Sequence, residues 1–432
     1  MVTIMKTYFI IMILVMLIYM VRHIVFSYNR LYSQQKISCR DIYDSDLPKI
    51  SVLLPMHNEG KVIPLIFKSL LECEYDPDKL EIIAVNDHST DATGEIIDHY
   101  AKAYPIIRPL HRLDPDQQRG KPVALNDAMS IASGEIFVVF DADYRPSKNL
   151  LKKLVSAFCD PIVGVVMGRV IPVNTGTNLL TNLLNLERTG GYQVDQQARY
   201  NLNLLPQYGG TVGAFRKELL MKDGGFDEHI LAEDTELTYR LALEGWRVAY
   251  DNSAECYEEA PETWDARGKQ VRRWSRGHNE VMFRYLGRTL RSQRLRFIQK
   301  FDAVLLLMVY TVPFLLGLAF LDCIALFFLG KMSIIAGWVF VLFVGAFNAW
   351  GNFAPFYEIA AGALLDGMKN EILALPALCF SFYFYMWNIS FGLFDALIDM
   401  VTNRRVDWIK TDRYAESDPD KIAVSNGKAA EK

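Results

Sequence analysis

Two aspartates, Asp141 and Asp143, stand just after an apolar run, residues 136–140, that predicts a buried strand. Carboxylates at positions i and i+2 beyond the end of a strand can converge on one divalent cation. Their oxygens suit Mg²⁺ or Mn²⁺, which keep open coordination positions for the phosphates of a substrate. Taken alone, the pair is more simply explained as two solvated loop acids. Its interpretation therefore depends on the rest of the chain.

Other polar side chains are predicted to lie at the same place as this pair. Asn58 and Asp87 follow apolar segments, residues 50–54 and 81–85, that predict strands. In open α/β sheets, ligands bind beyond the carboxyl ends of the strands. We therefore expect Asn58, Asp87 and Asp141 to face one crevice. That shared position supports a metal site.

Two further segments have both a functional and a structural explanation. Glu233 and Asp234 open a predicted helix, where the helix dipole favours acids in the first turn whatever their function. The glycines in residues 209–213 would either let the backbone approach a ligand closely or form a plain tight turn. The surroundings of each segment decide between these explanations.

The elements that position these residues alternate between strand and helix from about residue 49 onward. Helical spacing appears between the predicted strands, in residues 62–72, 92–104 and 122–133. Ser89 or Thr90 is expected to cap the second of these helices. The βαβα order predicts an α/β domain with a mostly parallel sheet. Farther along, residues 163–173 are predicted to form a pair of strands and residues 178–187 a helix.

Composition excludes several classes of function. The 432 residues carry a net charge of -4, which gives no case for a nucleic-acid partner. The six cysteines are scattered without a Cys-x-x-Cys pair, which argues against a zinc site and against a disulfide framework. We expect reduced thiols that face the cytosol.

Apolar segments at both ends of the chain predict a membrane protein. Residues 8–21, with a brief continuation to residue 26, are followed by no small-residue cleavage site, so residues 1–30 are expected to form an uncleaved signal anchor. Basic residues after this segment place the following domain in the cytoplasm by the positive-inside rule. Further membrane helices are predicted from three apolar segments, residues 303–321, 334–347 and 372–398.

The number of membrane crossings is left open. One N-terminal and three C-terminal spans would place the C-terminus outside, whereas the basic residues after residue 400 favour the cytoplasmic side. Either residues 351–365, which contain Pro355 and Glu358, belong to an extra crossing, or one segment does not cross. Before these spans, residues 261–300 combine arginines with apolar residues, which predicts amphipathic helices lying on anionic lipid headgroups.

Six short motifs follow one another along the chain: Pro55-Met56-His57-Asn58-Glu59, Asn86-Asp87-His88-Ser89-Thr90-Asp91, Gly120-Lys121, Asp141-Ala142-Asp143, Glu233-Asp234 and Gln270-x-x-Arg273-Trp274. Together they resemble the membrane-embedded, processive family 2 glycosyltransferases, which include cellulose, chitin, hyaluronan and poly-N-acetylglucosamine synthases. The resemblance covers roughly residues 49–288 and the flanking membrane plan, and residues 408–413 resemble a tail motif of some relatives. It implies four consecutive parts after the anchor: a cytoplasmic glycosyltransferase domain of the GT-A type (residues 45–260), interfacial helices (261–300), transmembrane helices (301–400) and a cytoplasmic tail (401–432).

The resemblance also implies a role for each motif residue. A UDP-sugar donor would be bound by His57, Glu59, Asp87, Lys121, Asp141, Asp143, Gln270 and Arg273. The carboxylates of Asp141 and Asp143 would hold Mg²⁺ or Mn²⁺, with Asp143 the more direct ligand. Asp234 would be the general base. The acceptor, a growing polysaccharide, would lie against Trp274, Gly210 and Thr211, although Trp274 also suits a membrane interface.

These roles agree with the chemistry of sugar transfer. The leaving diphosphate develops negative charge, which a metal ion and cationic side chains stabilise. The acceptor hydroxyl has a very high pKa and needs a base as it attacks C1 of the sugar, and Asp234 can serve if burial raises its pKa. A single displacement inverts the anomeric carbon, so an α-linked donor yields a β-linked product.

Three functions are consistent with these motifs. The first is a processive inverting synthase in the plasma membrane that makes a β-glucan or an N-acetylglucosamine polymer and extrudes it. Aromatic residues 380–387 would line its channel, but packing against lipid and helices explains them more simply. The second function is transfer of one sugar to a lipid carrier, whose known enzymes generally lack the Gln270-x-x-Arg273-Trp274 motif. The third is a non-catalytic membrane subunit, which the intact Asp141, Asp143 and Asp234 disfavour.

Overall fold

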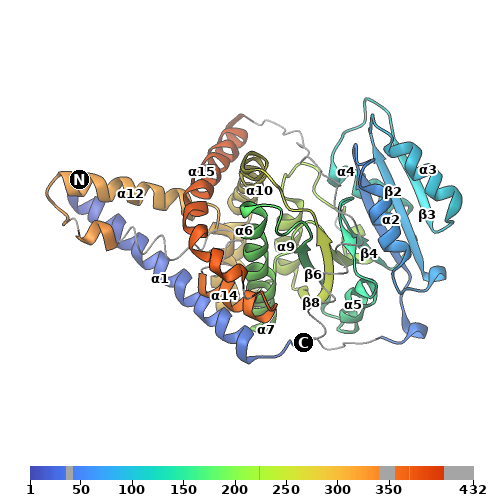
Figure 1. Cartoon of the computed structure of the whole chain (residues 1–432), viewed down its shortest axis with the longest axis horizontal. Helices are drawn as coiled ribbons and strands as arrows, with labels where there is room; N and C mark the ends of the chain where they lie inside the picture. Colours follow the sequence, from blue (N-terminus) through green and yellow to red (C-terminus); the bar gives the residue numbers. More distant parts are fainter. Residues whose placement is uncertain (36–41, 223, 334, 340–355, 369, 403–432) are drawn as a thin grey trace. The chain divides into compact units, whose positions relative to one another are not determined.

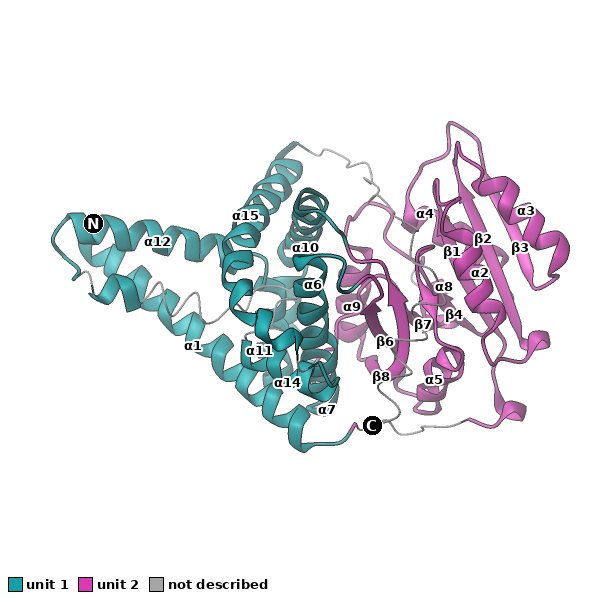
Figure 2. Cartoon of the chain, in the orientation of Figure 1, with its two compact units in different colours: residues 1–34, 175–204, 261–405 teal, residues 35–174, 205–260, 406–432 magenta. Residues whose placement is uncertain are grey.

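The computed structural model describes residues 1–35, 42–222, 224–333, 335–339, 356–368 and 370–402 (Figure 1). The chain divides into two compact units (Figure 2). Unit 1 comprises residues 1–34, 175–204 and 261–405, and unit 2 comprises residues 35–174, 205–260 and 406–432. The sequence predictions for Cys39, for most of residues 334–347, for residues 351–355 and for the tail from residue 403 onward lie outside the described residues.

Unit 2 is organised around one eight-stranded sheet with the order β3-β2-β1-β4-β7-β6-β8-β5. Its strands are β1 (Ile50–Met56), β2 (Leu80–Asp87), β3 (Ile107–Arg112), β4 (Ile136–Val139), β5 (Arg145–Pro146), β6 (Val163–Pro172), β7 (Gly213–Arg216) and β8 (Arg247–Glu258). The strands from β3 to β4 are parallel, β7 runs antiparallel to β4 and β6, and β5 runs antiparallel to β8. The sheet confirms the predicted α/β class, with the antiparallel strands confined to its second half.

The parallel half of the sheet is buried, which explains why its strands read as nearly continuous apolar runs. Every residue of β2 and β4 is buried, and α4 packs on β1 and β2. The helices of unit 2 are α2 (Ile63–Leu71), α3 (Thr93–Ala103), α4 (Lys121–Ile131), α5 (Leu150–Ser156), α8 (Lys217–Lys222) and α9 (Glu233–Glu244). Short 3-10 turns complete the unit: η1 (Asp44–Asp46), η2 (Pro77–Lys79) and η3 (Ala157–Cys159).

The segment predicted as a pair of strands forms the single strand β6. It pairs with β7 on one side and with β8 on the other. Both partners come from later in the chain, so the local apolar pattern contains no information about them. The prediction of a hairpin at residues 163–173 is therefore wrong.

The loop that follows β1 fixes the loop that follows β2. Asn58 Oδ1 accepts a hydrogen bond from the backbone N–H of Thr90 at 2.7 Å, and Asn58 N–H donates to Ser89 Oγ at 3.0 Å. The first turn of α3 is instead capped by Asp91, whose Oδ1 accepts from Thr93 N–H at 3.0 Å. The prediction that Ser89 or Thr90 caps this helix is wrong because Asn58 engages both residues.

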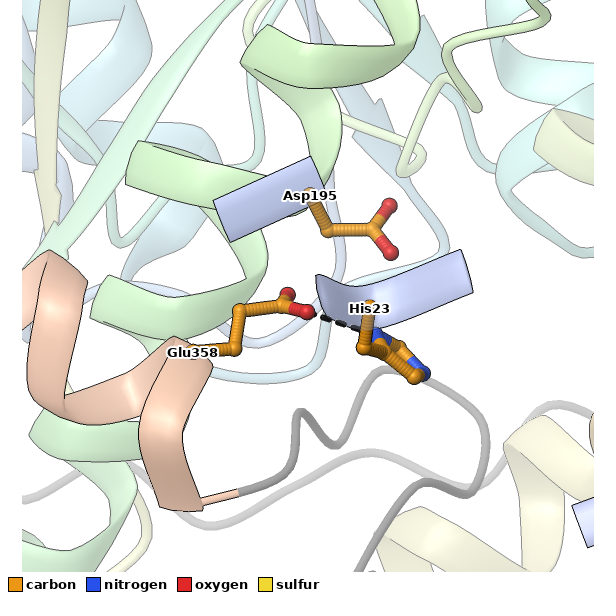
Figure 3. Close-up of side chains that lie close together, drawn as sticks. All are labelled: His23, Asp195 and Glu358. Carbon is orange, nitrogen blue, oxygen red and sulfur yellow. Dashed lines mark hydrogen bonds and ion pairs between the residues drawn. The ribbon is translucent and has the colours of Figure 1, made fainter. Parts of the chain in front are cut away.

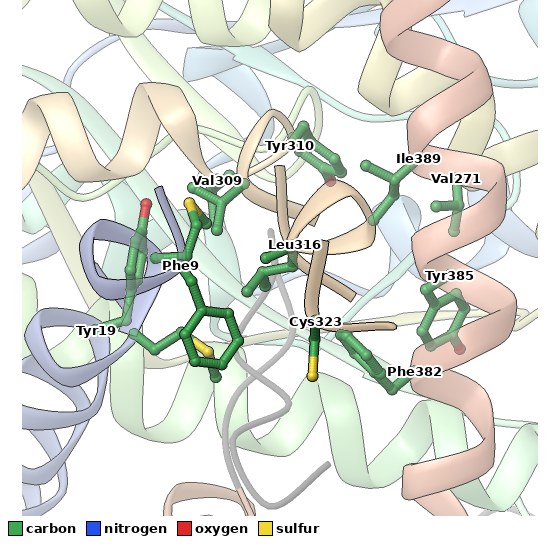
Figure 4. Close-up of a cluster of buried hydrophobic side chains, with 14 residues drawn as sticks. Phe9, Tyr19, Val271, Val309, Tyr310, Leu316, Cys323, Phe382, Tyr385 and Ile389 are labelled. Carbon is green, nitrogen blue, oxygen red and sulfur yellow. The ribbon is translucent and has the colours of Figure 1, made fainter. Parts of the chain in front are cut away.

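Unit 1 is helical. Its elements are α1 (Val2–Tyr32), α6 (Leu179–Thr189), η4 (Gly190–Gln196), α7 (Gln197–Asn201), α10 (Trp264–Arg291), α11 (Phe297–Met308), α12 (Val312–Phe328), α14 (Phe356–Leu365), η5 (Glu371–Ala377) and α15 (Leu378–Thr402). A π-helical turn, η4, links α6 to α7. One apolar core joins α1, α10, α12 and α15 (Figure 4), through residues that include Phe9, Val271, Leu316 and Ile389.

Two of the described helical stretches, Val2–Tyr32 and Glu371–Thr402, are long and apolar enough to cross a membrane. A third candidate consists of α11 and α12, which meet at an angle of 69°. The membrane segment expected over residues 303–321 thus falls on two helices that meet at a bend, and its crossing of the membrane stays a prediction. Pro313 lies at the start of α12, where it lacks the N–H that would continue the helix from α11. The pair is either a broken span or a re-entrant loop.

Helix α10 carries the Gln270-x-x-Arg273-Trp274 motif and packs tightly on α15. A Cβ atom added to Gly392 would lie 2.5 Å from the backbone oxygen of Arg272, so only glycine allows this approach. Ser275 Oγ donates to the backbone oxygen of Ile389 at 2.8 Å. The motif is thus built into one 28-residue helix fixed to a candidate membrane span.

Among the five cysteines that the structure describes, one differs from expectation. Cys73, Cys256, Cys323 and Cys379 are free thiols, whereas Cys159 is disulfide-bonded. The expectation of reduced thiols throughout is therefore wrong for Cys159.

Candidate active site

The predicted site residues of unit 2 lie at the carboxyl ends of the parallel strands. His57 and Glu59 follow β1, Asp87 ends β2, and Asp141 follows β4. Strand β7 runs antiparallel to β4, with Gly213 opposite Val139, so the preceding loop starts at the same edge. The topology therefore gathers residues from four loops, as the crevice argument predicts.

Lys121 is the centre of this group. It is the first residue of α4, and its Nζ donates to the backbone oxygen of Gly210 at 2.6 Å. The same Nζ lies 2.7 Å from Asp141 Oδ1 and 3.6 Å from Glu233 Oε1. Burial by itself would lower the pKa of Lys121, but the carboxylates of Asp141 and Glu233 outweigh it and raise that pKa. The ammonium group therefore stays charged and joins three loops.

The loop before β7 brings a glycine close to the acids. Gly210 has φ of +85°, and a Cβ atom there would lie 3.3 Å from Asp234 Oδ2 and 3.7 Å from Lys121 Nζ. Thr211 is buried, and its Oγ1 accepts a hydrogen bond from Asp141 N–H at 3.2 Å. Glycine at position 210 therefore supplies a backbone conformation that other residues rarely adopt, and its lack of a side chain avoids a tight contact with Asp234.

The first turn of α9 presents two acids in a buried setting. Asp234 Oδ1 accepts from Thr235 N–H at 2.6 Å, while Oδ2 faces Gly210. Burial raises the pKa of Asp234, opposed by the Thr235 N–H. Burial also raises the pKa of Glu233 to about 7, opposed by Lys121. A carboxylate with a raised pKa is the kind of group that removes a proton from a substrate.

Asp87 binds protein groups through both of its oxygens. Its Oδ1 accepts from His88 Nδ1 at 2.7 Å and from Arg112, and its Oδ2 accepts from Gly120 N–H at 2.9 Å. Asp87 therefore fixes the residue directly before Lys121. The predicted contact between Asp87 and uridine stays a prediction, and the observed role is to position the loop.

The residues after β1 are also held by the second loop. His57 Nδ1 donates to the backbone oxygen of Asp87 at 2.7 Å. Glu59 is buried, and its N–H donates to Thr93 Oγ1 at 2.9 Å. Both side chains lie at the predicted edge of the sheet, and their roles in donor binding stay predictions.

Asp141 and Asp143 differ in exposure. The Asp141 side chain is 32% exposed and paired with Lys121, whereas Asp143 is 5% exposed in the loop that leads to β5. The donor set fits Mg²⁺ or Mn²⁺ because carboxylate oxygens are hard ligands, and Glu233 adds another near Lys121. Which of these carboxylates would bind the ion stays a prediction.

The remaining predicted residues belong to unit 1. Gln270, Arg273 and Trp274 lie on α10, and each side chain is half-buried. Gln270 Oε1 accepts a hydrogen bond from Arg267 Nη1 at 2.8 Å. The structure thus gathers the predicted residues of unit 2 at one edge of its sheet, and places these three together on one helix of unit 1.

Sequence reasoning missed the role of Arg112. This residue is 3% exposed and donates to Asp87, to Asp127 and to the backbone oxygen of Gln118 at 2.7 Å. It ends β3, next to the end of β2 in the sheet. Strand β3 is not among the strands predicted from the sequence, so the place of Arg112 beside Asp87 depends on a strand pairing that the local pattern does not contain.

One other cluster resembles a metal site by residue type. His23, Asp195 and Glu358 of unit 1 place their ligand atoms within 4.8 Å of one another (Figure 3). Asp195, however, pairs through one oxygen with Arg22 at 3.0 Å and through the other with Arg199. Those guanidinium groups neutralise the carboxylate, and Arg22 would repel a divalent cation. The cluster is therefore better explained as part of a network of ion pairs that connects α1, η4 and α14.

Comparison with known proteins identifies the class of this chain. A family model described as "Glycosyl transferase family 2" matches residues 51–223. A relative from Bacillus subtilis (strain 168), named "Probable glycosyltransferase YdaM", is 31% identical over 384 residues, which cover 85% of this chain and 88% of that protein. The chain therefore belongs to glycosyl transferase family 2 and is a glycosyltransferase.

More distant relatives have two kinds of name. A beta-monoglucosyldiacylglycerol synthase from Synechocystis is 30% identical over 267 residues, 62% of this chain and 55% of that protein. A poly-beta-1,6-N-acetyl-D-glucosamine synthase from Staphylococcus aureus (strain COL) is 28% identical over 280 residues, 64% of this chain and 66% of that protein. These two relatives differ in the product that their names describe.

A solved structure shares the fold. The mannosyltransferase PcManGT from Pyrobaculum calidifontis, in complex with GDP-Man and Mn²⁺, is 21% identical, with a TM-score of 0.60 over 94% of this chain and 99% of that one. At this identity the likeness concerns the fold, which is that of a GT-A glycosyltransferase.

Proposed function

We propose that this enzyme transfers a sugar from a UDP-sugar donor with inversion and makes a β-linked product. The observation that carries the proposal is the partly buried cluster formed by Lys121, Asp141, Glu233 and Asp234 around Gly210. It places a cation suited to a diphosphate close to a carboxylate suited to act as a base. The names of both kinds of relative include a β-linkage, which supports the same stereochemistry.

Asp234 is the proposed general base. Its Oδ2, which faces Gly210, takes the proton of the acceptor hydroxyl as the hydroxyl oxygen attacks C1 of the sugar. The bond between C1 and the diphosphate oxygen breaks, and UDP leaves with the electron pair. Attack opposite the leaving group turns an α-linked donor into a β-linked product.

The leaving diphosphate is the proposed target of the cationic groups. Lys121 is charged and oriented by its contact with Gly210 O, so it can pass from Asp141 to a phosphate oxygen. Asp141 and Asp143 are the proposed ligands of Mg²⁺ or Mn²⁺, which would stabilise the charge of the diphosphate. His57, Glu59 and Asp87 are proposed to hold the uridine end, and Gln270 and Arg273 to contribute to diphosphate binding.

A growing polysaccharide is the proposed acceptor. The motif Gln270-x-x-Arg273-Trp274 on α10 supports this choice, as does the relative named for poly-β-1,6-N-acetylglucosamine synthesis. The Trp274 ring, with Gly210 and Thr211, is proposed to contact the acceptor sugar. We further propose a plasma-membrane location, with α1, the α11–α12 pair and α15 in the bilayer, a cytoplasmic catalytic domain and export of a glucose or N-acetylglucosamine polymer.

A lipid acceptor is the second candidate. Two relatives, one 30% and one 32% identical, are named beta-monoglucosyldiacylglycerol synthase. Such an enzyme would use the same base and donor site and add one sugar to a diacylglycerol hydroxyl. A non-catalytic subunit is the weaker alternative, because Asp141, Asp143 and Asp234 are all present.

A donor screen tests the reaction. Purified full-length protein is given radiolabelled UDP-glucose, UDP-N-acetylglucosamine, UDP-galactose or UDP-glucuronate with Mn²⁺, with and without diacylglycerol. We expect UDP release and a β-linked product with glucose or N-acetylglucosamine, and a loss of about 10²- to 10⁴-fold in Asp234→Asn. Full activity in Asp234→Asn would overturn the proposed base, and label found only in single-sugar glycolipid would favour the second candidate.

A further inference from the structure

Arg267 shares one face of α10 with the motif residues. Gln270 lies three residues later and Trp274 seven residues later, spacings that bring side chains to the same side of a helix. The side chain of Arg267 is 4% exposed, unusually low for an arginine. A buried guanidinium group therefore lies beside the motif.

The Arg267 guanidinium contacts two of the three motif residues, Gln270 and Trp274. Its Nη1 donates to Gln270 Oε1 at 2.8 Å, and its carbon lies 5.1 Å from the centre of the Trp274 ring. The hydrogen bond fixes the orientation of the Gln270 amide, because its oxygen must face Arg267. The contact with the ring restricts Trp274 by a cation–π interaction.

Arg267 is itself held in place from two other helices. Its Nη2 lies 3.0 Å from Glu187 Oε2 of α6, a side chain that is also 4% exposed. The guanidinium carbon lies 5.2 Å from the Tyr385 ring of α15, which is fully buried. Because α6, α10 and α15 all belong to unit 1, these contacts form one rigid support.

We propose that Arg267 is the positioning residue of the Gln270-x-x-Arg273-Trp274 motif. One planar group joins Glu187 to Gln270 and Trp274, so the motif side chains are ordered before substrate binds. Lysine has one ammonium group and cannot provide two directed hydrogen bonds and a stacked plane together. The inference rests on the proposed function, in which these motif residues bind donor and acceptor.

A double-mutant cycle tests this role. We expect Arg267→Lys to lower kcat/KM by about tenfold to a hundredfold, because a misplaced motif fails to orient substrate. In a chain that already carries Gln270→Ala and Trp274→Ala, the same change should cost little more, since the groups positioned by Arg267 are gone. Equal fractional losses in both backgrounds would overturn the inference.

The control is Arg276→Lys on the same helix. Arg276 pairs with Asp399 of α15 and lies outside the motif, so the substitution should leave kcat/KM unchanged. If Arg267→Lys lowers the melting temperature more than Arg276→Lys does, the cycle is repeated with Glu187→Gln. Glu187→Gln keeps Arg267 but weakens the ion pair that holds its side chain. If this variant lowers kcat/KM only in the chain with an intact motif, the result supports the same conclusion.

Failure of the proposed function gives a different result. If Gln270→Ala and Trp274→Ala by themselves leave activity unchanged, the motif does not bind substrate and the proposed function of these residues is wrong. If they reduce activity but Arg267→Lys adds its full loss to theirs, only the positioning role is wrong.

Discussion

At the scale of single residues, the site depends on how opposite charges are placed around Gly210. Lys121 pairs with Asp141 and Glu233, while Asp234 turns one oxygen to Thr235 and the other to Gly210. The proposed function assigns Lys121 to the leaving group and Asp234 to the acceptor. Each role can be changed by substituting one residue.

Gly210→Ala should lower kcat by about tenfold or more, because its methyl group would lie 3.3 Å from Oδ2 of Asp234, the proposed base, and displace that carboxylate. The change also places a side chain at φ of +85°. Gly176→Ala is a matched control, since Gly176 has φ of +87° with no atom within 4 Å of an added Cβ. Initial rates and melting temperatures of the two variants separate the effect on Asp234 from the backbone strain. Equal loss of activity in both would contradict the proposed role of Asp234 beside Gly210.

The acids of α9 predict the pH dependence of the reaction. Asp234 must be ionised to accept a proton, and burial raises its pKa, while the neighbouring Glu233 has a pKa of about 7. Activity should therefore rise with pH as Asp234 loses its proton, and fall as pH drops through the raised pKa of Asp234. Glu233→Gln removes one negative charge next to Asp234, which lowers the pKa of Asp234.

The acid side of the pH profile of kcat should consequently move to lower pH in Glu233→Gln. The measurement is kcat from pH 5 to pH 9 in both proteins, a range that brackets the pKa of about 7 of Glu233. An unchanged acid side would show that Glu233 and Asp234 are not coupled through their charges.

At the scale of elements, the close contact between α10 and α15 ties the motif helix to a candidate membrane span. Gly392 makes this contact possible, because an added Cβ would lie 2.5 Å from the backbone oxygen of Arg272. Two ion pairs, Arg272 with Asp395 and Arg276 with Asp399, run along the same interface. The interface therefore depends on backbone approach as well as on charge.

Gly392→Val should destabilise the protein by about 1–3 kcal/mol or more, because the helices must move apart to fit the side chain. Gly287→Ala on α10 is the control, since its nearest neighbour is an Arg291 side-chain atom at 3.9 Å. That change should stabilise by up to about 1 kcal/mol through helix propensity. Thermal unfolding in detergent measures both, and a Gly392→Val protein as stable as the wild type would contradict the packing.

The elements also show which parts of the fold follow from local sequence. The apolar run before Asp141 predicted β4 because a strand buried in a sheet has to be apolar throughout. The bend between α11 and α12 was missed, because the apolar composition continues past the break at Pro313. Likewise, β6 was split into a pair because its partners lie dozens of residues farther along the chain.

The candidate site could be predicted at positions where the proposed chemistry requires a particular type of residue. Asp141 was singled out by its position after a predicted strand, and Asp234 by the resemblance to family 2 glycosyltransferases. The hydrogen bond from Gly120 N–H to Asp87, and the contact of Arg112 with the same aspartate, depend on the register between β2 and β3. That register cannot be predicted from the sequence. The exposure of each side chain could not be predicted from the sequence either, and Asp143 proves to be buried.

At the scale of the whole molecule, the acceptor decides what kind of enzyme the chain is. Membership of family 2 and a GT-A fold are compatible both with polymer synthesis and with transfer of a single sugar to a lipid. The two functions would use the same donor site. The helical unit carries the difference, because its motif and its candidate spans would hold and export a chain. The central claim is therefore processive synthesis of a β-linked polymer.

The size of the first products tests this claim most directly. The purified full-length protein in lipid nanodiscs receives a short pulse of radiolabelled UDP-N-acetylglucosamine or UDP-glucose with Mn²⁺, and the products are separated by gel filtration. We predict a high-mass product, sensitive to a β-glycanase, from the earliest times, and none from Asp234→Asn. A chloroform-soluble product with one sugar per lipid at every time point would contradict the claim.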